Sequence, residues 1–155
     1  MKNVFIFLKE KKGYEIPLKF KLFHNITLTD DERIVDVSMN LSYSNITSLP
    51  NNIHFIYSLD LRSSQIKSLP DNLYVGGFLD LENTQLTSLP DNLYVRSWLS
   101  IRDTNIKTIP NNLYVGGSLF LDSKTWGDDN NETISNIRNL IKNKNGEIIG
   151  NIYIQ

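Results

Sequence analysis

Apolar and polar residues follow one another along this chain in a pattern that repeats every 20 residues. Each copy has a triplet, in which two apolar residues flank a variable one, and a later Leu-Pro or Ile-Pro step. The triplet pairs are Met39 and Leu41, Leu59 and Leu61, Leu79 and Leu81, Leu99 and Ile101, and Leu119 and Leu121. The proline steps end at Pro50, Pro70, Pro90 and Pro110. A fixed period of this length is typical of a solenoid, in which each repeat forms one coil.

The spacing inside each repeat predicts a short strand followed by a return segment. Two apolar residues separated by one position point to the same side of a strand, so five stacked parallel strands over residues 39–122 would share one core. The return segments add Ile46, Ile66, Leu86 and Ile106, then Leu73, Leu93 and Leu113, then Val75, Val95 and Val115. Proline ends the regular pairing because it has no N–H to donate. We expect Gly76-Gly77 and Gly116-Gly117 to make the tight bend before the next strand by adopting positive φ.

The pattern L-x-L-x-x-(T/S/N)-x-L-x-x-L-P resembles the leucine-rich repeat family over about residues 37–122. Its period and its Leu-Pro step are similar to the short repeats of bacterial secreted effectors and of related phage and bacterial proteins. The family's asparagine ladder is replaced by Ser44, Ser64, Thr84 and Thr104, and the second Leu-Pro by Asp/Asn-Asn-Leu-Tyr-Val. The resemblance implies recognition of a protein on the concave strand face, and it implies no catalytic chemistry.

The N-terminal residues depart from the repeat, as expected for a cap over the end of a solenoid core. Residues 14–22 alternate between apolar and polar side chains, which predicts a half-buried strand. Together with the apolar run at residues 4–8, this strand predicts a β-hairpin. We therefore assign residues 1–38 to an N-terminal capping hairpin and its connector.

The C-terminal residues 123–155 predict a second cap. A helix is expected from about Glu132 to Lys144, with Asn130 or Asn131 as its N-cap and a final strand over residues 147–155. The apolar stripe of this helix is formed by Ile134, Ile137, Leu140 and Ile141. The predicted fold is one mainly β solenoid domain, with short parallel strands on one face and a cap at each end.

Composition excludes several classes of function. The chain has 16 Lys+Arg and 17 Asp+Glu residues, whereas a nucleic-acid or anionic-membrane binder usually has a basic excess. The absence of cysteine excludes disulfides and thiol catalysis, and it fits a reducing compartment. No segment reaches the roughly 18 apolar residues of a membrane span, and residues 4–8 are too short for a secretory signal. We therefore expect a protein of the cytoplasm of the producing or infected cell that contacts no membrane.

The polar residues form no pattern typical of an active site or a metal site. His24 and His54 lack the spacing of a metal pair, and His54 takes the place that Tyr74 has in the next repeat. The acidic stretch at residues 128–132 lacks the residue order of a calcium loop. No phosphate-binding glycine loop and no G-x-S-x-G motif is present. We therefore expect no enzymatic activity, no cofactor and no metal.

The variable strand positions face away from the core, and we expect some of them to bind a partner. Phe78, Trp98 and Phe120 are large aromatics at positions where other repeats carry polar residues, and such apolar patches mark interaction sites. Their alternative role is packing beneath a terminal cap. A neighbouring column alternates in charge through Arg62, Glu82, Arg102 and Asp122. These charges could pair between strands about 4.8 Å apart or orient a partner. The predicted partner-binding residues are Phe78, Trp98, Phe120, Arg62, Glu82, Arg102 and Asp80.

Three classes of function fit these observations. The first is a non-enzymatic protein–protein interaction module, an inhibitor or effector that occludes a cellular or host protein through its strand face. The second is a structural or assembly subunit of a larger complex, which would oligomerise constitutively. The third is a nucleic-acid binder or mimic, which the near-neutral charge disfavours because phosphate attraction dominates such binding.

Overall fold

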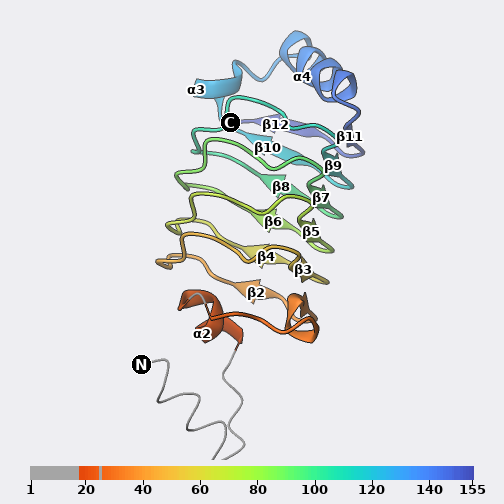
Figure 1. Cartoon of the computed structure of the whole chain (residues 1–155). Coiled ribbons are helices and arrows are strands. Elements are labelled where there is room, and N and C mark those ends of the chain that lie inside the picture. The colour runs from red at the N-terminus through yellow and green to blue at the C-terminus, as the bar shows by residue number, and fades with distance from the viewer. Residues whose placement is uncertain (1–17, 25) are drawn as a thin grey trace, which may run out of the picture.

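The computed structural model describes residues 18–24 and 26–155 and shows a parallel β-solenoid (Figure 1). The triplets form the strands β2 (Met39–Asn40), β4 (Leu59–Asp60), β6 (Leu79–Asp80), β8 (Leu99–Ser100) and β10 (Leu119–Leu121). The first four of these each pair in parallel with the strand of the next coil, 20 residues later. The strand β12 (Ile152–Ile154) pairs with β10 and completes six strands, which we call the triplet sheet. The predicted solenoid of parallel strands is confirmed.

A second sheet of six parallel strands, which the repeat pattern did not predict, runs through the return segments. We call it the return sheet. Its strands are β1 (Ile34–Val35), β3 (His54–Phe55), β5 (Tyr74–Val75), β7 (Tyr94–Val95), β9 (Tyr114–Val115) and β11 (Glu147–Ile148). In the four of these strands that belong to full repeats, β3, β5, β7 and β9, the second residue is fully buried and the first faces outward. His54 pairs in register with Tyr74, which confirms that it occupies a repeat position.

Each coil turns at two corners where the backbone is left-handed. The corners before the return strands are at Asn52, Asn72, Asn92 and Asn112, and those after the triplet strands are at Tyr43, Ser63, Asn83 and Asp103. Asparagine and aspartate tolerate this conformation better than most residues. The expected positive φ at the glycine pairs is wrong, because Gly127 is the only glycine with positive φ in the described part of the chain. A Cβ at Gly76 would instead lie 2.1 Å from the carbonyl oxygen of Ile56, so glycine lets adjacent coils approach closely.

The core is a continuous column of apolar side chains between the two sheets. Leu79 and Leu81 from the triplet sheet and Val75 from the return sheet are completely buried. The serine and threonine side chains that replace the asparagine ladder close the corner beside this core. Thr84 Oγ1, for example, donates to the carbonyl of Leu81 at 2.8 Å. Ser44 and Thr104 donate to the residue three positions earlier in the same way. These bonds therefore lie within one coil and do not join neighbouring coils.

The N-terminal cap differs from the predicted hairpin. Leu18–Phe23 form the helix α2, followed by the short 3-10 turn η1 (Asp31–Arg33), so the strand expected over residues 14–22 is wrong wherever the structure describes it. The helical spacing of Leu18 and Leu22 lets both side chains pack toward the core. The rest of the expected hairpin, residues 1–17, lies outside the described residues.

Side chains of the N-terminal cap bind backbone oxygens at the first edge of the solenoid. Lys19 Nζ in α2 donates to the carbonyl of Asn40 at 2.8 Å, and the guanidinium of Arg33 donates to the carbonyl of Asn51. Figure 1 shows α2 at this end of the stack. Exposed edge groups invite pairing with another strand, and cationic side chains placed on them oppose it.

At the other end, the predicted C-terminal helix is confirmed as α4 (Asn131–Asn143), preceded by the short helix α3 (Ser123–Trp126) (Figure 1). The Asn130 side chain is the N-cap of α4 and accepts a hydrogen bond from the Thr133 N–H at 2.9 Å. Ile137 and Ile141 are buried, but Leu140 is 38% exposed and does not belong to the packed stripe. No helix among the described residues is long and apolar enough to cross a membrane.

The single strand expected over residues 147–155 is two strands, because this segment repeats half a coil. Glu147 and Ile152 pair with Tyr114 and Leu119, so the five-residue step between the two sheets is preserved. Arg138 of α4 donates to the carbonyls of Ile148 at 3.2 Å and Gly150 at 2.7 Å. The last coil is thus covered by a cationic side chain, as the first one is.

Candidate partner-binding face

Four aromatic side chains form a row across the outer face of the triplet sheet. The Phe78 and Trp98 rings are stacked, with centroids 4.4 Å apart and planes 5° apart. Trp98 meets Phe120 edge to face at 5.9 Å, and Phe120 stacks on Tyr153 at 5.1 Å. We call these four residues the aromatic row. The structure therefore brings the three predicted aromatics into contact and adds Tyr153.

The geometry of the row follows from the register of the strands. Phe78 and Trp98 each precede a triplet strand, whereas Phe120 lies two positions further along, opposite Ser100. The ring of Phe120 is therefore offset from that of Trp98, which suits an edge-to-face contact. Tyr153 is the register partner of Phe120 and remains 37% exposed. The C-terminal cap thus extends the aromatic surface with Tyr153.

Charged side chains beside the row are fixed by ion pairs and hydrogen bonds. The Arg102 guanidinium lies 2.7 Å from Glu82 Oε2 and donates to Gln155 Oε1 at 2.6 Å, and its centre is 5.8 Å from the Phe120 ring centroid. Arg62 pairs instead with Asp60 of its own coil, at 3.1 Å.

The predicted charge ladder is therefore only partly formed. Only the Arg102–Glu82 pair joins two neighbouring coils among the ion pairs that the structure describes. Asp122 takes no part in the ladder. Its carboxylate is buried and caps α3 by accepting a hydrogen bond from the Thr125 N–H at 2.9 Å. Arg62 reaches Asp60 because the two residues are only two positions apart, where β4 ends and the turn begins.

Asp80 lies deeper than a predicted partner contact should. It is 6% exposed, stands opposite Asp60 in the sheet, and accepts a hydrogen bond from the Glu82 N–H at 3.1 Å. Burial raises the pKa of the Asp80 carboxyl above its usual range, and the nearby charges of Asp60 and Glu82 raise it further. The Glu82 N–H and the Arg62 charge act in the opposite direction. Asp80 is therefore a recessed carboxylate in an electrostatically unfavourable place.

A hollow of about 240 Å³ opens beside Asp80 on this face. Its lining is formed by Asp80, Trp98, Ser100, Arg102 and Phe120. Ser100 is 2% exposed, and its hydroxyl has no hydrogen-bond partner among the described residues. Sequence reasoning missed Ser100, because a serine in an outward column looks like ordinary surface. It also missed Tyr153, although Ile152-Tyr153-Ile154 repeats the apolar–aromatic–apolar form of residues 119–121.

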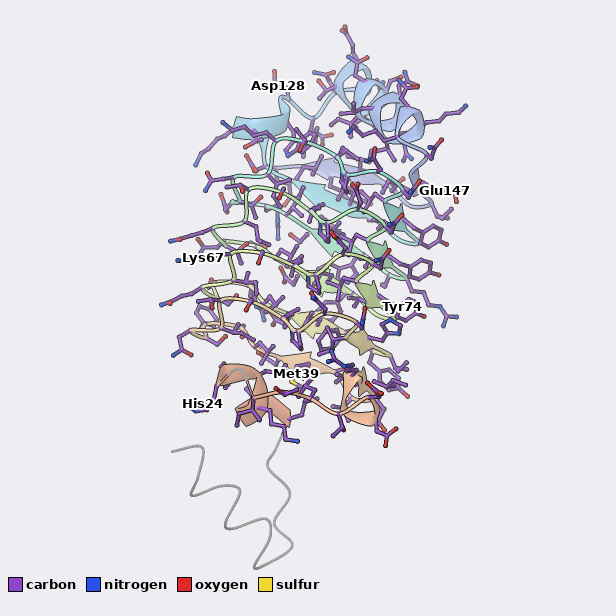
Figure 2. The ribbon with its side chains drawn as sticks, viewed as in Figure 1. His24, Met39, Lys67, Tyr74, Asp128 and Glu147 are labelled. Carbon is purple, nitrogen blue, oxygen red and sulfur yellow. The ribbon has the colours of Figure 1, made fainter. Side chains whose placement is uncertain are left out.

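A second set of aromatics lies on the return sheet and serves the fold. Tyr74 stacks on Tyr94 at 4.9 Å, and Tyr94 stacks on Tyr114 at 4.5 Å. His54 extends this stack with a tilted ring. Figure 2 shows Tyr74 and Lys67 on opposite sides of the solenoid. Because an aromatic side chain stands at this position in every full repeat, it belongs to the repeat itself. The aromatic row occupies only some coils and is the better candidate for a specific contact.

No group of three acidic, histidine or cysteine side chains in the described part of the chain could hold a metal ion. Comparison with protein families, with curated proteins and with solved structures gives no match to this chain.

Proposed function

We propose that the protein is a non-catalytic binding module of the leucine-rich repeat type that recognises another protein through the outer face of its triplet sheet. The observation that carries the proposal is the aromatic row. The positions equivalent to Phe78 and Trp98 in other coils are Ser38, Ser58 and Ser118, so the solenoid does not require large apolar residues there. Aromatic residues, tryptophan above all, are enriched where proteins bind one another.

The row is also held in place before any partner arrives. Trp98 is packed between Phe78 and Phe120, and Arg102 is held by Glu82 and Gln155. Side chains that are already ordered lose little conformational freedom on binding, which favours affinity. This arrangement supports a surface with Trp98 at its centre and arginine at its border.

The leucine-rich repeat assignment is supported by the two inward apolar residues of each triplet and by the third inward residue five positions later. Within this class, we propose an inhibitor or effector that occludes a cellular or host protein in the cytoplasm of the producing or infected cell, of phage or bacterial type. A chain without cysteine does not depend on an oxidising compartment.

The test compares three immobilised full-length proteins as baits in lysate of the producing or infected cell: the unchanged chain, Trp98→Ala and Lys67→Ala. Proteins captured by the unchanged chain are identified by mass spectrometry, and their affinity is then measured by calorimetry. Trp98→Ala should weaken binding by at least about 2 kcal/mol, roughly thirtyfold, because a central tryptophan is removed. Lys67 is exposed and lies away from the row, so Lys67→Ala should bind as the unchanged chain does.

Thermal melts of the same variants separate binding from folding. The Trp98 side chain points away from the core, so the melting temperature of Trp98→Ala should stay close to that of the unchanged chain. A partner that binds Trp98→Ala with full affinity would refute the proposal. Sizing by light scattering adds a further check, because a constitutive oligomer held by the row would indicate an assembly subunit instead.

A further inference from the structure

The charges on the outer face of the triplet sheet do not balance. Arg62 is paired with Asp60 at 3.1 Å, and Arg102 is paired with Glu82 at 2.7 Å. Asp80 has no cationic side chain within ion-pair distance among the residues that the structure describes. One of its carboxylate oxygens accepts the Glu82 N–H. Asp80 is therefore a buried carboxylate whose charge no cationic side chain matches.

The hollow beside Asp80 places an unsatisfied hydroxyl next to this carboxylate. Asp80 and Ser100 stand opposite each other on β6 and β8, strands that are about 4.8 Å apart in any sheet. Both are more than nine-tenths buried, and the Ser100 hydroxyl lacks a partner in the described residues. A buried hydroxyl is normally hydrogen-bonded, so an unsatisfied hydroxyl beside a carboxylate without a cation points to a missing ligand. The aromatic rings of Trp98 and Phe120 and the side chain of Arg102 form the rest of the lining.

We propose that this hollow binds an arginine side chain of the partner protein, an inference that rests on the proposed function. A guanidinium is planar and carries five N–H donors in a fixed fork, so it can donate to Asp80 and to the Ser100 hydroxyl together. Its flat face can lie against the Trp98 ring, where the π electrons attract a cation. A lysine ammonium supplies charge but neither the fork nor the flat face.

The electrostatics of the surroundings favour a cation in this place. The pKa of the Asp80 carboxyl is raised by burial and by Asp60 and Glu82, so a positive charge beside it relieves both effects. Repulsion from Arg102 is limited, since Glu82 neutralises that guanidinium at 2.7 Å. Arg102 also lies over Phe120, which shows the same type of cation–aromatic contact within this face.

The hollow can be tested with small probes and without a known partner. The full chain is titrated with N-acetylarginine methylamide while the indole N–H signal of Trp98 is followed by NMR. The Trp98 signal is the one retained in Trp126→Phe, since the chain has two tryptophans. We expect a saturable shift of this signal. The citrulline analogue has the same shape without the charge and should bind at least about tenfold more weakly. The lysine analogue should bind at least about threefold more weakly, because it lacks the planar fork.

Two matched variants test whether the charge of Asp80 is responsible for binding the arginine probe. Asp80→Asn keeps an oxygen that can accept the Glu82 N–H but removes the charge, and it should weaken arginine binding at least about tenfold. Asp71→Asn removes an exposed carboxylate from a corner of the same solenoid and should leave the affinity unchanged. Equal binding of arginine and citrulline, or full binding by Asp80→Asn, would overturn the proposal. Lysine binding as strong as arginine binding would overturn the assignment to a guanidinium.

The probe titration is independent of the bait experiment, so the two proposals fail separately. If the captured partner is lost in Trp98→Ala but the arginine probe does not bind, the face binds protein and the hollow is not an arginine site. If the probe binds with the expected selectivity but Trp98→Ala keeps the partner, the hollow is a cation site and the proposed function is wrong.

Discussion

The substitution Leu81→Ala tests the inward column at its centre. Leu81 is completely buried, with coils packed on both sides of it. The change removes three carbon atoms from the core, and each buried methylene contributes about 0.8 kcal/mol to folding. The space left behind adds a further penalty where neighbouring side chains cannot move into it. We therefore expect the free energy of unfolding to fall by about 2–5 kcal/mol.

The position of Leu81 also predicts a change in cooperativity. In a solenoid each coil contacts only its neighbours, so a weak coil in the middle loosens the coupling between the two halves. Unfolding in urea should therefore become less steep as well as shift to lower urea. A lower slope reports less surface exposed in one cooperative step.

The measurement is equilibrium unfolding in urea, followed by far-ultraviolet circular dichroism. Leu140→Ala is the matched control, because Leu140 is 38% exposed on α4 and alanine suits a helix well. The control should change the free energy of unfolding by less than about 1 kcal/mol, as surface substitutions usually do. A change of less than about 1 kcal/mol for Leu81→Ala itself would show that the inward column is assigned incorrectly.

Three further predictions concern the edges and corners of the solenoid. Arg138→Ala should lower the free energy of unfolding by about 1 kcal/mol in urea melts and increase self-association in sedimentation, because two edge carbonyls lose their donor. Gly76→Ala should lower the melting temperature far more than Ser97→Ala, since a Cβ at Gly76 would lie 2.1 Å from a carbonyl oxygen. The pKa of Asp91 should lie below its usual range in carboxyl NMR titrations, and Asn111→Ala should raise it, because the Asn111 side chain and backbone donate to Asp91. The stabilisation from these bonds is present above the unfolded-state pKa and is lost as the pH falls through the lower folded-state pKa.

The solenoid could be predicted from sequence because every coil must bury apolar residues at the same positions, which gives the sequence a fixed period. The triplets place two apolar residues on one side of each strand, and the structure buries them accordingly. The return sheet was missed because its repeat strands, such as Tyr74–Val75, are two residues long and too short to show alternation. The helix α2 was missed because Leu18, Phe20 and Leu22 fit a strand period, while the spacing of Leu18 and Leu22 also fits a helix.

Only part of the candidate site could be predicted from the positions of its residues in the repeat. Contact among Phe78, Trp98 and Phe120 follows from their places on successive strands. The depth of Asp80 does not follow, because an outward strand position becomes buried only when larger neighbours stand around it. The lack of a cation beside Asp80 could not be predicted either, because the sequence does not show that Arg62 pairs with Asp60 and Arg102 with Glu82.

The caps let the number of coils change without altering the proposed binding face. Lys19 and Arg33 bind the first edge and Arg138 binds the last, so neither end depends on how many coils lie between them. Duplication of one 20-residue coil near residue 50 would move the N-terminal cap by a strand spacing of about 4.8 Å. The aromatic row, which starts at Phe78, would stay as it is. Evolution or a designer could therefore change the length of the molecule in steps of one coil while the aromatic row remains unchanged.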